Sequence, residues 1–163
     1  MLDTNALLHT LTEQVRHLLS TLELPDPALV GIHTGGVWVA QHLQTALGIS
    51  TPLAMVDTAF HRDDFERIGL HANPQPTHLP FDVNGRHLIL VDDVLHTGRS
   101  TRAALDELFS YGRPASVHLV VLVERPGREL PIQADAVGTH LDLSPQQRLK
   151  LSGPSPLQLH LLS

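Results

Sequence analysis

Two adjacent carboxylates, Asp92 and Asp93, follow the apolar run Leu88–Val91 and precede a loop of small and hydroxyl-bearing residues. The run has no polar alternation, which is typical of a strand covered on both faces in a parallel sheet. We expect the aspartates to end this strand, at the sheet edge where open α/β folds bind ligands. Carboxylates there can accept hydrogen bonds from sugar hydroxyls. N–H groups of a loop at a helix start can hold a phosphate.

The loop itself supplies backbone N–H groups, three hydroxyls and one guanidinium. Its residues are Thr97, Gly98, Arg99, Ser100 and Thr101. Apolar residues then recur with helical spacing over residues 102–109, and the partial positive charge of a helix N-terminus favours a bound anion. Taken singly, the aspartates could cap a helix and Thr97–Gly98 could form an ordinary turn. The joint pattern indicates a sugar-phosphate site.

A second glycine-containing loop, Thr34–Gly36, follows the apolar segment Ala28–Ile32. Glycine lets a backbone come close to a ligand, so this loop could approach a second anionic group. The alternative is a simple turn between a strand and a helix.

These segments, in their order and spacing, resemble the PyrR family, pyrimidine-operon regulators that are also uracil phosphoribosyltransferases. The run Leu88–Thr101 resembles the phosphoribosyl-pyrophosphate (PRPP) signature of type I phosphoribosyltransferases. The resemblance covers about residues 29–144, and the segment Arg128–Ile132 favours PyrR over other phosphoribosyltransferases. Its remaining parts are Val30–Gly36, Asp57–Asp64, Glu124–Ile132 and Ala134–Gly138.

The resemblance implies an α/β protein with the type I phosphoribosyltransferase fold, a largely parallel central sheet flanked by helices with a mobile lid loop. It implies transfer of ribose 5-phosphate from PRPP to uracil, giving UMP and pyrophosphate. Mg²⁺ would arrive with PRPP and would have no protein ligands of its own. UMP or UTP, and pyr leader RNA, are the further implied partners.

The resemblance also assigns roles to individual residues. Asp92 and Asp93 would hold the ribose hydroxyls, and their charge would favour the cationic ribosyl ring. Residues 97–101 would bind the 5′-phosphate. The remaining assignments are Thr34, Gly35, Gly36 and Arg62 for pyrophosphate, Arg125 as a further substrate contact, and the backbone near Val137 and Gly138 for uracil. No residue stands out as a general base.

This chain departs from the family pattern in three places. Gly35 stands where the family usually has arginine, which removes a charge-assisted hydrogen bond of about 1.5–3 kcal/mol. Activity would then be reduced, because each 1.4 kcal/mol is about a factor of ten. His61 and His96 replace a frequent tyrosine, and their titration makes pH-dependent PRPP binding a hypothesis. Thr139–His140 replaces a frequent Lys-Asn pair.

Two other functions remain open. The chain could be a uridine-nucleotide-sensing regulator that keeps the site but has weak or no catalysis, which the departures at residues 35 and 139–140 favour. It could also be a phosphoribosyltransferase for another base, against which the segment 128–132 argues.

Composition agrees with a compact enzyme. The 163 residues are 42% hydrophobic with mean hydropathy +0.01 and no cysteine, so disulfides and thiolate chemistry are excluded. No apolar stretch nears the ~20 residues that span a membrane, and we expect a cytoplasmic protein.

The net charge is −6, with ten arginines and one lysine, Lys150, scattered along the chain. RNA binding needs a basic surface, which makes it the weaker inference. The twelve histidines show no metal-ligand spacing.

The elements that position these residues can be read from periodicity, and we expect one domain over residues 1–163. Residues 4–22 form an amphipathic helix. Its apolar face could equally belong to the core or form the interface of a homodimer or higher homo-oligomer. A second helix should span residues 37–47 and end at Gly48. Strands are expected over residues 28–32, 52–58, 88–91, 117–123 and 134–138. Residues 59–80 read as a lid, and the tail 144–163 receives no assignment.

Overall fold

Five parallel strands form the central sheet of the computed structural model, which describes residues 2–58 and 76–163. Their spatial order is β2-β1-β3-β4-β5. The strands are β1 (Ala28–Ile32), β2 (Ala54–Val56), β3 (His87–Leu95), β4 (Ser116–Glu124) and β5 (Ala136–His140). Because all four pairings are parallel, the carboxyl ends of the strands meet at one edge, as expected from the sequence.

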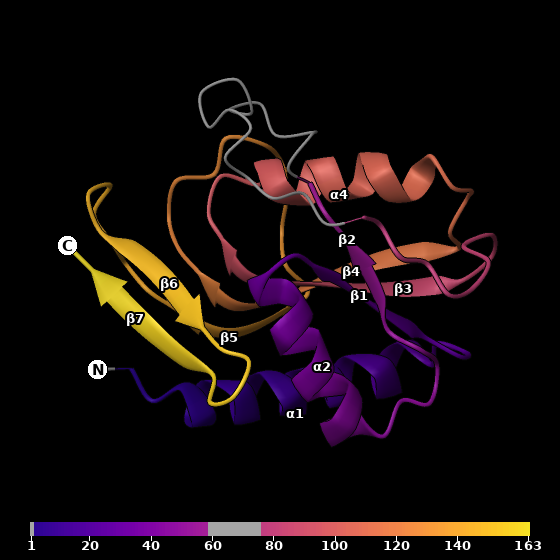
Figure 1. Cartoon of the computed structure of the whole chain (residues 1–163), viewed down its shortest axis with the longest axis horizontal. Coiled ribbons are helices and arrows are strands. Elements are labelled where there is room, and N and C mark those ends of the chain that lie inside the picture. Colours follow the sequence, from indigo (N-terminus) through magenta and orange to yellow (C-terminus); the bar gives the residue numbers. More distant parts are fainter. Residues whose placement is uncertain (1, 59–75) are drawn as a thin grey trace.

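Helices cover both faces of this sheet. Figure 1 shows α1 (Thr4–Leu22) and α2 (Gly35–Leu47) on one face and α4 (Arg99–Phe109) on the other. Alternate residues of a strand therefore enter two separate cores. Ile89 and Val91 pack with α1 and α2, whereas Leu88 and Leu90 pack with α4. The predicted α/β fold with a parallel sheet flanked by helices is confirmed.

The helix α1 has the bounds predicted from its apolar stripe. Asp3 caps its start, where Oδ1 accepts a hydrogen bond from the Ala6 N–H at 3.1 Å. Its side chains Leu8, Leu11 and Val15 are buried in the main core. The apolar face of α1 is therefore a core element.

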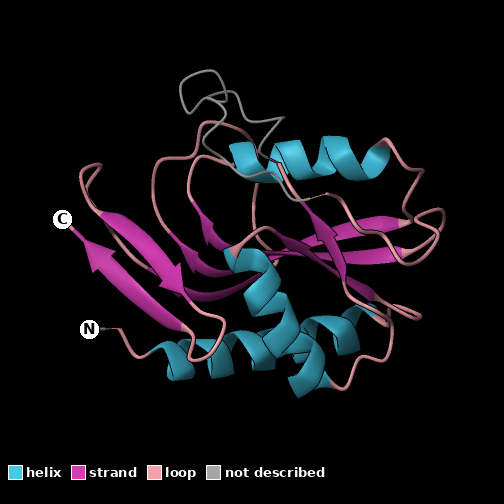
Figure 2. Cartoon of the chain, viewed as in Figure 1, coloured by secondary structure: helices cyan, strands magenta, loops and turns pink. Residues whose placement is uncertain are grey.

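A C-terminal hairpin occupies the tail to which the sequence analysis assigned no structure. The antiparallel strands β6 (Arg148–Ser152) and β7 (Gln158–Leu162) lie beside the carboxyl edge of the sheet (Figure 2). Leu151 and Leu159 are buried in the main core, and the Leu159 N–H donates to Thr4 Oγ1 at 2.8 Å. Alternating leucines at Leu149, Leu151, Leu159 and Leu161 were the available signal, on both sides of a Gly-Pro-Ser-Pro turn.

Several predicted boundaries are wrong by a few residues. Asp92 and Asp93 do not end β3, which continues to Leu95 because Val94 and Leu95 still pair with β4. The helices α2 and α4 begin two and three residues before the predicted starts of 37 and 102, at Gly35 and Arg99. The strand β2 is limited to residues 54–56, and β5 begins at 136.

The predicted lid falls mostly outside the described residues, which exclude 59–75 and with them Arg62 and His61. Its last part is described, and there His78 exchanges two backbone hydrogen bonds with Met55 of β2, at 2.8 and 2.9 Å. In the described ranges, no helix is both long and apolar enough to cross a membrane.

Candidate active site

The glycine loop (Thr34–Gly36) and the aspartate pair meet at the carboxyl edge of the sheet. A Cβ atom on Gly35 would lie only 2.7 Å from Asp93 Cγ, and one on Gly36 only 3.0 Å from Asp92 Cα. Only glycines allow this approach, because real Cβ atoms need more than 3 Å. Both glycines belong to the first turn of α2, so the start of this helix lies directly against the carboxylates. The structure thus brings together the two predicted parts of the site.

The two carboxylates are fixed by the backbone that carries them. Asp92 Oδ1 accepts from the Asp93 N–H at 2.8 Å, and Asp93 Oδ1 accepts from the Val94 N–H at 2.9 Å. Asp92 is buried and Asp93 is partly buried. Such carboxylates in the last part of a strand can accept hydrogen bonds from the hydroxyls of a sugar.

The phosphate loop (Thr97–Thr101) forms the start of α4. Gly98 has a positive φ of 94°, which a glycine adopts without strain, and it places Arg99, Ser100 and Thr101 in the first helical turn. The Arg99 N–H donates to Thr97 Oγ1 at 3.2 Å. A helix start of this kind attracts an anion through its N–H groups and its dipole.

A second loop, which we call the brace loop (Arg125–Ile132), holds the phosphate loop in place. The N–H groups of Glu129 and Leu130 donate to the Thr97 carbonyl at 2.9 and 3.2 Å. The Arg99 guanidinium pairs with Glu129 at 2.7 Å, with both side chains about half exposed. Gly98 packs against Ile132, where an added Cβ would meet the side chain at 3.1 Å.

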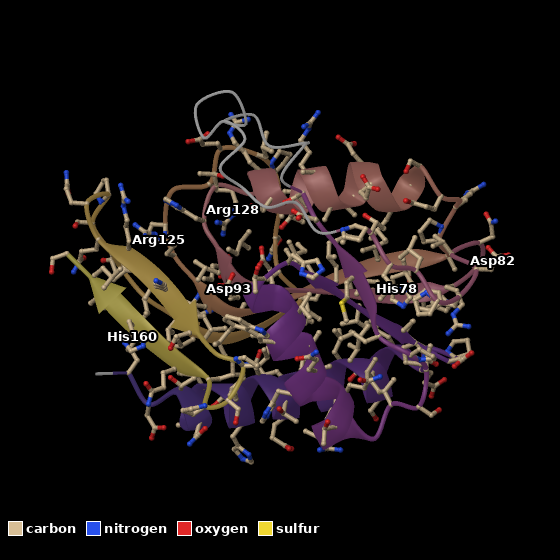
Figure 3. The ribbon with its side chains drawn as sticks, in the orientation of Figure 1. His78, Asp82, Asp93, Arg125, Arg128 and His160 are labelled. Atoms are coloured by element: carbon tan, nitrogen blue, oxygen red, sulfur yellow. The ribbon has the colours of Figure 1, made fainter. Side chains whose placement is uncertain are left out.

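Arg128 joins the brace loop to the phosphate loop and to β4. Its Nε donates to the Ile132 carbonyl at 2.9 Å, one terminal nitrogen donates to the His96 carbonyl, and the other pairs with Glu124. Glu124 also accepts from His140 Nδ1 at 2.8 Å. Figure 3 shows Arg128, Arg125 and Asp93 on the side of the molecule away from Asp82. In the sequence, this segment is only a marker of the family, and nothing in it indicates its structural role.

Arg125 is buried and holds the segment that leads into β6. Its terminal nitrogens donate to the carbonyls of Gln147 and Ser144 at 2.7 and 2.9 Å. Its Nε has no hydrogen-bond partner among the described residues. Arg125 also lines a cavity of about 340 Å³ between the end of β3 and the hairpin, together with Val94, His96 and Leu149. Its predicted contact with substrate stays a prediction.

The prediction that backbone groups near Val137 and Gly138 read a base stays a prediction, and the Val137 amide is already engaged within the chain. The Val137 N–H donates to Gln14 Oε1 of α1 at 3.0 Å. Gly138 lies where α1 crosses β5, and a Cβ there would be 3.1 Å from the Leu7 carbonyl oxygen. The residues of β5 nearest the carboxyl edge are Thr139 and His140.

His96 lies at the end of β3, beside the cavity and the phosphate loop. Partial desolvation and the positive charge of Arg125 lower the pKa of His96 below its ordinary value of 6.5, with a further contribution from Arg128 and opposition from Glu129. The neutral imidazole therefore predominates at pH 7.

Magnesium has suitable oxygen donors in the carboxylates of Asp92 and Asp93. In the described parts of the chain, no group of three or more His, Asp or Glu side chains could hold a metal ion. Mg²⁺ commonly uses one or two carboxylates and completes its shell with substrate phosphates and water. The donor set fits a metal ion of that kind.

Comparison with known proteins identifies relatives along most of the chain. Residues 3–147 match the phosphoribosyl transferase domain. The bifunctional protein PyrR of Nitrosococcus oceani is 57% identical over 159 residues, which cover 96% of this chain and 90% of that protein. The bifunctional protein PyrR of Pseudomonas fluorescens is 51% identical over 156 residues, which cover 96% of this chain and 93% of that protein.

Solved structures share the fold at much lower identity. A hypoxanthine-guanine phosphoribosyltransferase from Bacillus anthracis has a TM-score of 0.70 and 16% identity, over 90% of this chain and 84% of that one. A hypoxanthine phosphoribosyltransferase from Staphylococcus aureus has a TM-score of 0.66 and 17% identity, over 87% and 77% of the two chains. At such identities the likeness establishes the fold alone.

Proposed function

Because this chain belongs to the phosphoribosyltransferase family, and within it to the PyrR proteins, we propose that it converts uracil and PRPP to UMP and pyrophosphate. The observation that carries the proposal is the meeting of two helix starts and two carboxylates at one sheet edge. Each helix start suits one of the two phosphorylated ends of PRPP, and the carboxylates between them suit its ribose.

The 5′-phosphate is assigned to residues 97–101, at the start of α4. Asp92 and Asp93 accept hydrogen bonds from the ribose 2′- and 3′-hydroxyls. Pyrophosphate is assigned to Thr34, Gly35 and Gly36 at the start of α2. Arg62, outside the described residues, is proposed as a further pyrophosphate ligand. Mg²⁺ bound with PRPP would neutralise charge on the leaving group.

The reaction breaks the bond between ribose C1 and pyrophosphate and forms a bond from C1 to uracil N1, which loses its proton. Since C1 becomes cation-like as pyrophosphate leaves, the carboxylates of Asp92 and Asp93 stabilise the transition state electrostatically. The brace loop fixes the phosphate loop, which holds the other end of the substrate in position. Positioning and charge stabilisation therefore supply the catalysis.

The uracil ring is assigned to the cavity of about 340 Å³ beside His96 and Arg125. Val94, which directly follows Asp93 in β3, supplies an apolar wall of this cavity. Arg125 lines the same cavity, and its two terminal nitrogens are held by the carbonyls of Gln147 and Ser144. A purine remains the competing base, and competition between UMP and GMP separates the two.

The test is formation of UMP from radiolabelled uracil, PRPP and Mg²⁺, with Asp92→Asn and Asp93→Asn as controls. Turnover that the controls abolish supports the enzyme. UMP binding without turnover would favour the second candidate, a nucleotide-sensing regulator. The lack of a charged side chain at Gly35 in the glycine loop also favours this candidate.

The regulatory half of the proposal is control of pyrimidine genes through pyr leader RNA in the cytoplasm, by a homodimer or larger assembly. On the hairpin, Arg148 and Lys150 are two residues apart in β6 and therefore lie on the same face. In the strand register, Lys150 is directly opposite His160 of β7. Cations on one face could contact RNA phosphates. Filter binding of leader RNA over a salt series, with wild type and an Arg148→Gln/Lys150→Gln double variant, tests this, and light scattering tests the assembly.

A further inference from the structure

The side chain of Asp93, which belongs to β3, lies against the first residue of α2. The three atoms nearest to the Cβ position of Gly35 all belong to the Asp93 side chain, with Cγ at 2.7 Å. Any other residue at position 35 would have to displace this carboxylate. The absence of a side chain at Gly35 is therefore what gives the Asp93 carboxylate its place.

This position is also electrostatically favourable for a carboxylate. Gly35 is the first residue of a 13-residue helix, and Thr34 makes no side-chain capping hydrogen bond. The N-terminal end of a helix attracts negative charge, and Asp93 supplies it. The second oxygen of the same carboxylate accepts from the Val94 N–H at 2.9 Å, which orients the group.

The same helix start is the subsite assigned above to pyrophosphate. Residues 33–36 carry no permanently charged side chain that could compensate the Asp93 charge. An incoming pyrophosphate must therefore displace the carboxylate or bind beside it, and both reduce its affinity. UMP has no group at this subsite, so the carboxylate does not oppose it.

We propose that Gly35 and Asp93 act together as a selectivity determinant that favours the nucleotide UMP over metal-free ligands carrying pyrophosphate. Asp93 acts as an internal anion at the start of α2 in addition to its role at the ribose. The inference rests on the proposed function, because it takes the position of pyrophosphate from there.

The test compares binding of inorganic pyrophosphate and of UMP by calorimetry, without Mg²⁺, to the full chain. Asp93→Asn removes the charge and keeps the shape. Asp92→Asn is the matched control, since it removes an equal charge from the neighbouring residue. No atom of Asp92 is among the three nearest to the Gly35 Cβ position. Gly35→Ala is a second, independent variant that displaces the carboxylate sterically. Thermal unfolding checks that each variant is folded.

We expect Asp93→Asn to tighten pyrophosphate binding roughly tenfold or more, the effect of one partly exposed charge within a few ångströms. UMP binding should stay the same or weaken, because a ribose contact is altered. Gly35→Ala should also tighten pyrophosphate, and Asp92→Asn should tighten it less than Asp93→Asn does.

Unchanged pyrophosphate affinity in Asp93→Asn overturns the inference, as does equal tightening in Asp92→Asn, and both leave the proposed function standing. Absence of UMP binding in the wild type instead contradicts the proposed function, and the inference falls with it.

Discussion

Replacement of Arg128 by methionine should weaken phosphate binding without any change to the phosphate loop itself. Arg128 donates to the carbonyls of Ile132 and His96 and pairs with Glu124. Methionine keeps most of the aliphatic stem but removes all three interactions. Of these, only the one to the His96 carbonyl connects the brace loop directly to the residue before the phosphate loop.

The size of the effect follows from that connection. A hydrogen bond from a charged donor contributes about 1.5–3 kcal/mol, which corresponds to roughly 10- to 100-fold in affinity for UMP. Lysine should restore little, since it lacks the planar guanidinium that serves Ile132, His96 and Glu124 at once. The unfolding temperature should also fall, because Glu124 would lose one of the two charged partners that it has among the described residues, Arg128 and His140.

The assay is calorimetric titration of UMP into wild type, Arg128→Met, Arg128→Lys and Arg16→Met. Arg16 is a suitable control because its pair with Glu13 is about half exposed on α1, away from the site. A folded Arg128→Met protein that binds UMP within threefold of wild type would refute the role of Arg128 as a positioning residue.

Three further results are expected. Leu159→Ala should lower stability by about 2–5 kcal/mol in urea unfolding and the half-exposed Leu161→Ala by much less, and equal losses would contradict a docked hairpin. Gly36→Ala should cost about 1–3 kcal/mol or more, because its Cβ would overlap the backbone of β3; an unchanged melting temperature would count against this. Partial desolvation and Arg125 lower the pKa of His96, so folding favours its neutral form. This contribution is present above pH 6.5 and lost as pH falls below it, and His96→Gln should remove that part of the pH dependence. PRPP affinity should accordingly gain no pH dependence from His96 between pH 7 and 8, and a change over that range that His96→Gln removes would contradict the neutral state of His96.

The sequence predicted best those features that depend on nearby residues. The helix α1 and the strand β1 have their predicted bounds, because the apolar spacing of each is local and regular. The aspartate pair and both loops could be identified from residue type. Carboxylates and glycines that follow apolar strand segments together are seldom explained by caps and turns alone. The starts of α2 and α4 were placed too late, because glycine and polar residues in a first turn do not look helical.

Features that depend on distant residues were predicted poorly. The Val137 amide is occupied by Gln14, which lies 123 positions away, and nothing local to Val137 indicates this. Arg125 likewise binds carbonyls about twenty residues further along the chain. The hairpin was missed because Leu151 and Leu159 become buried only in the main core, which residues far away in the sequence build, while its Pro-rich turn looks like a loop.

The chain has one tryptophan, Trp38, and it lies in α2 directly against the hairpin turn. A Cβ atom on Gly153 would be 3.1 Å from the indole ring. The indole is therefore an intrinsic optical reporter at the junction between the helix that starts at the glycine loop and the C-terminal strands. A red shift of its emission that precedes the loss of helical circular dichroism would report detachment of the hairpin as a separate step, with no added label.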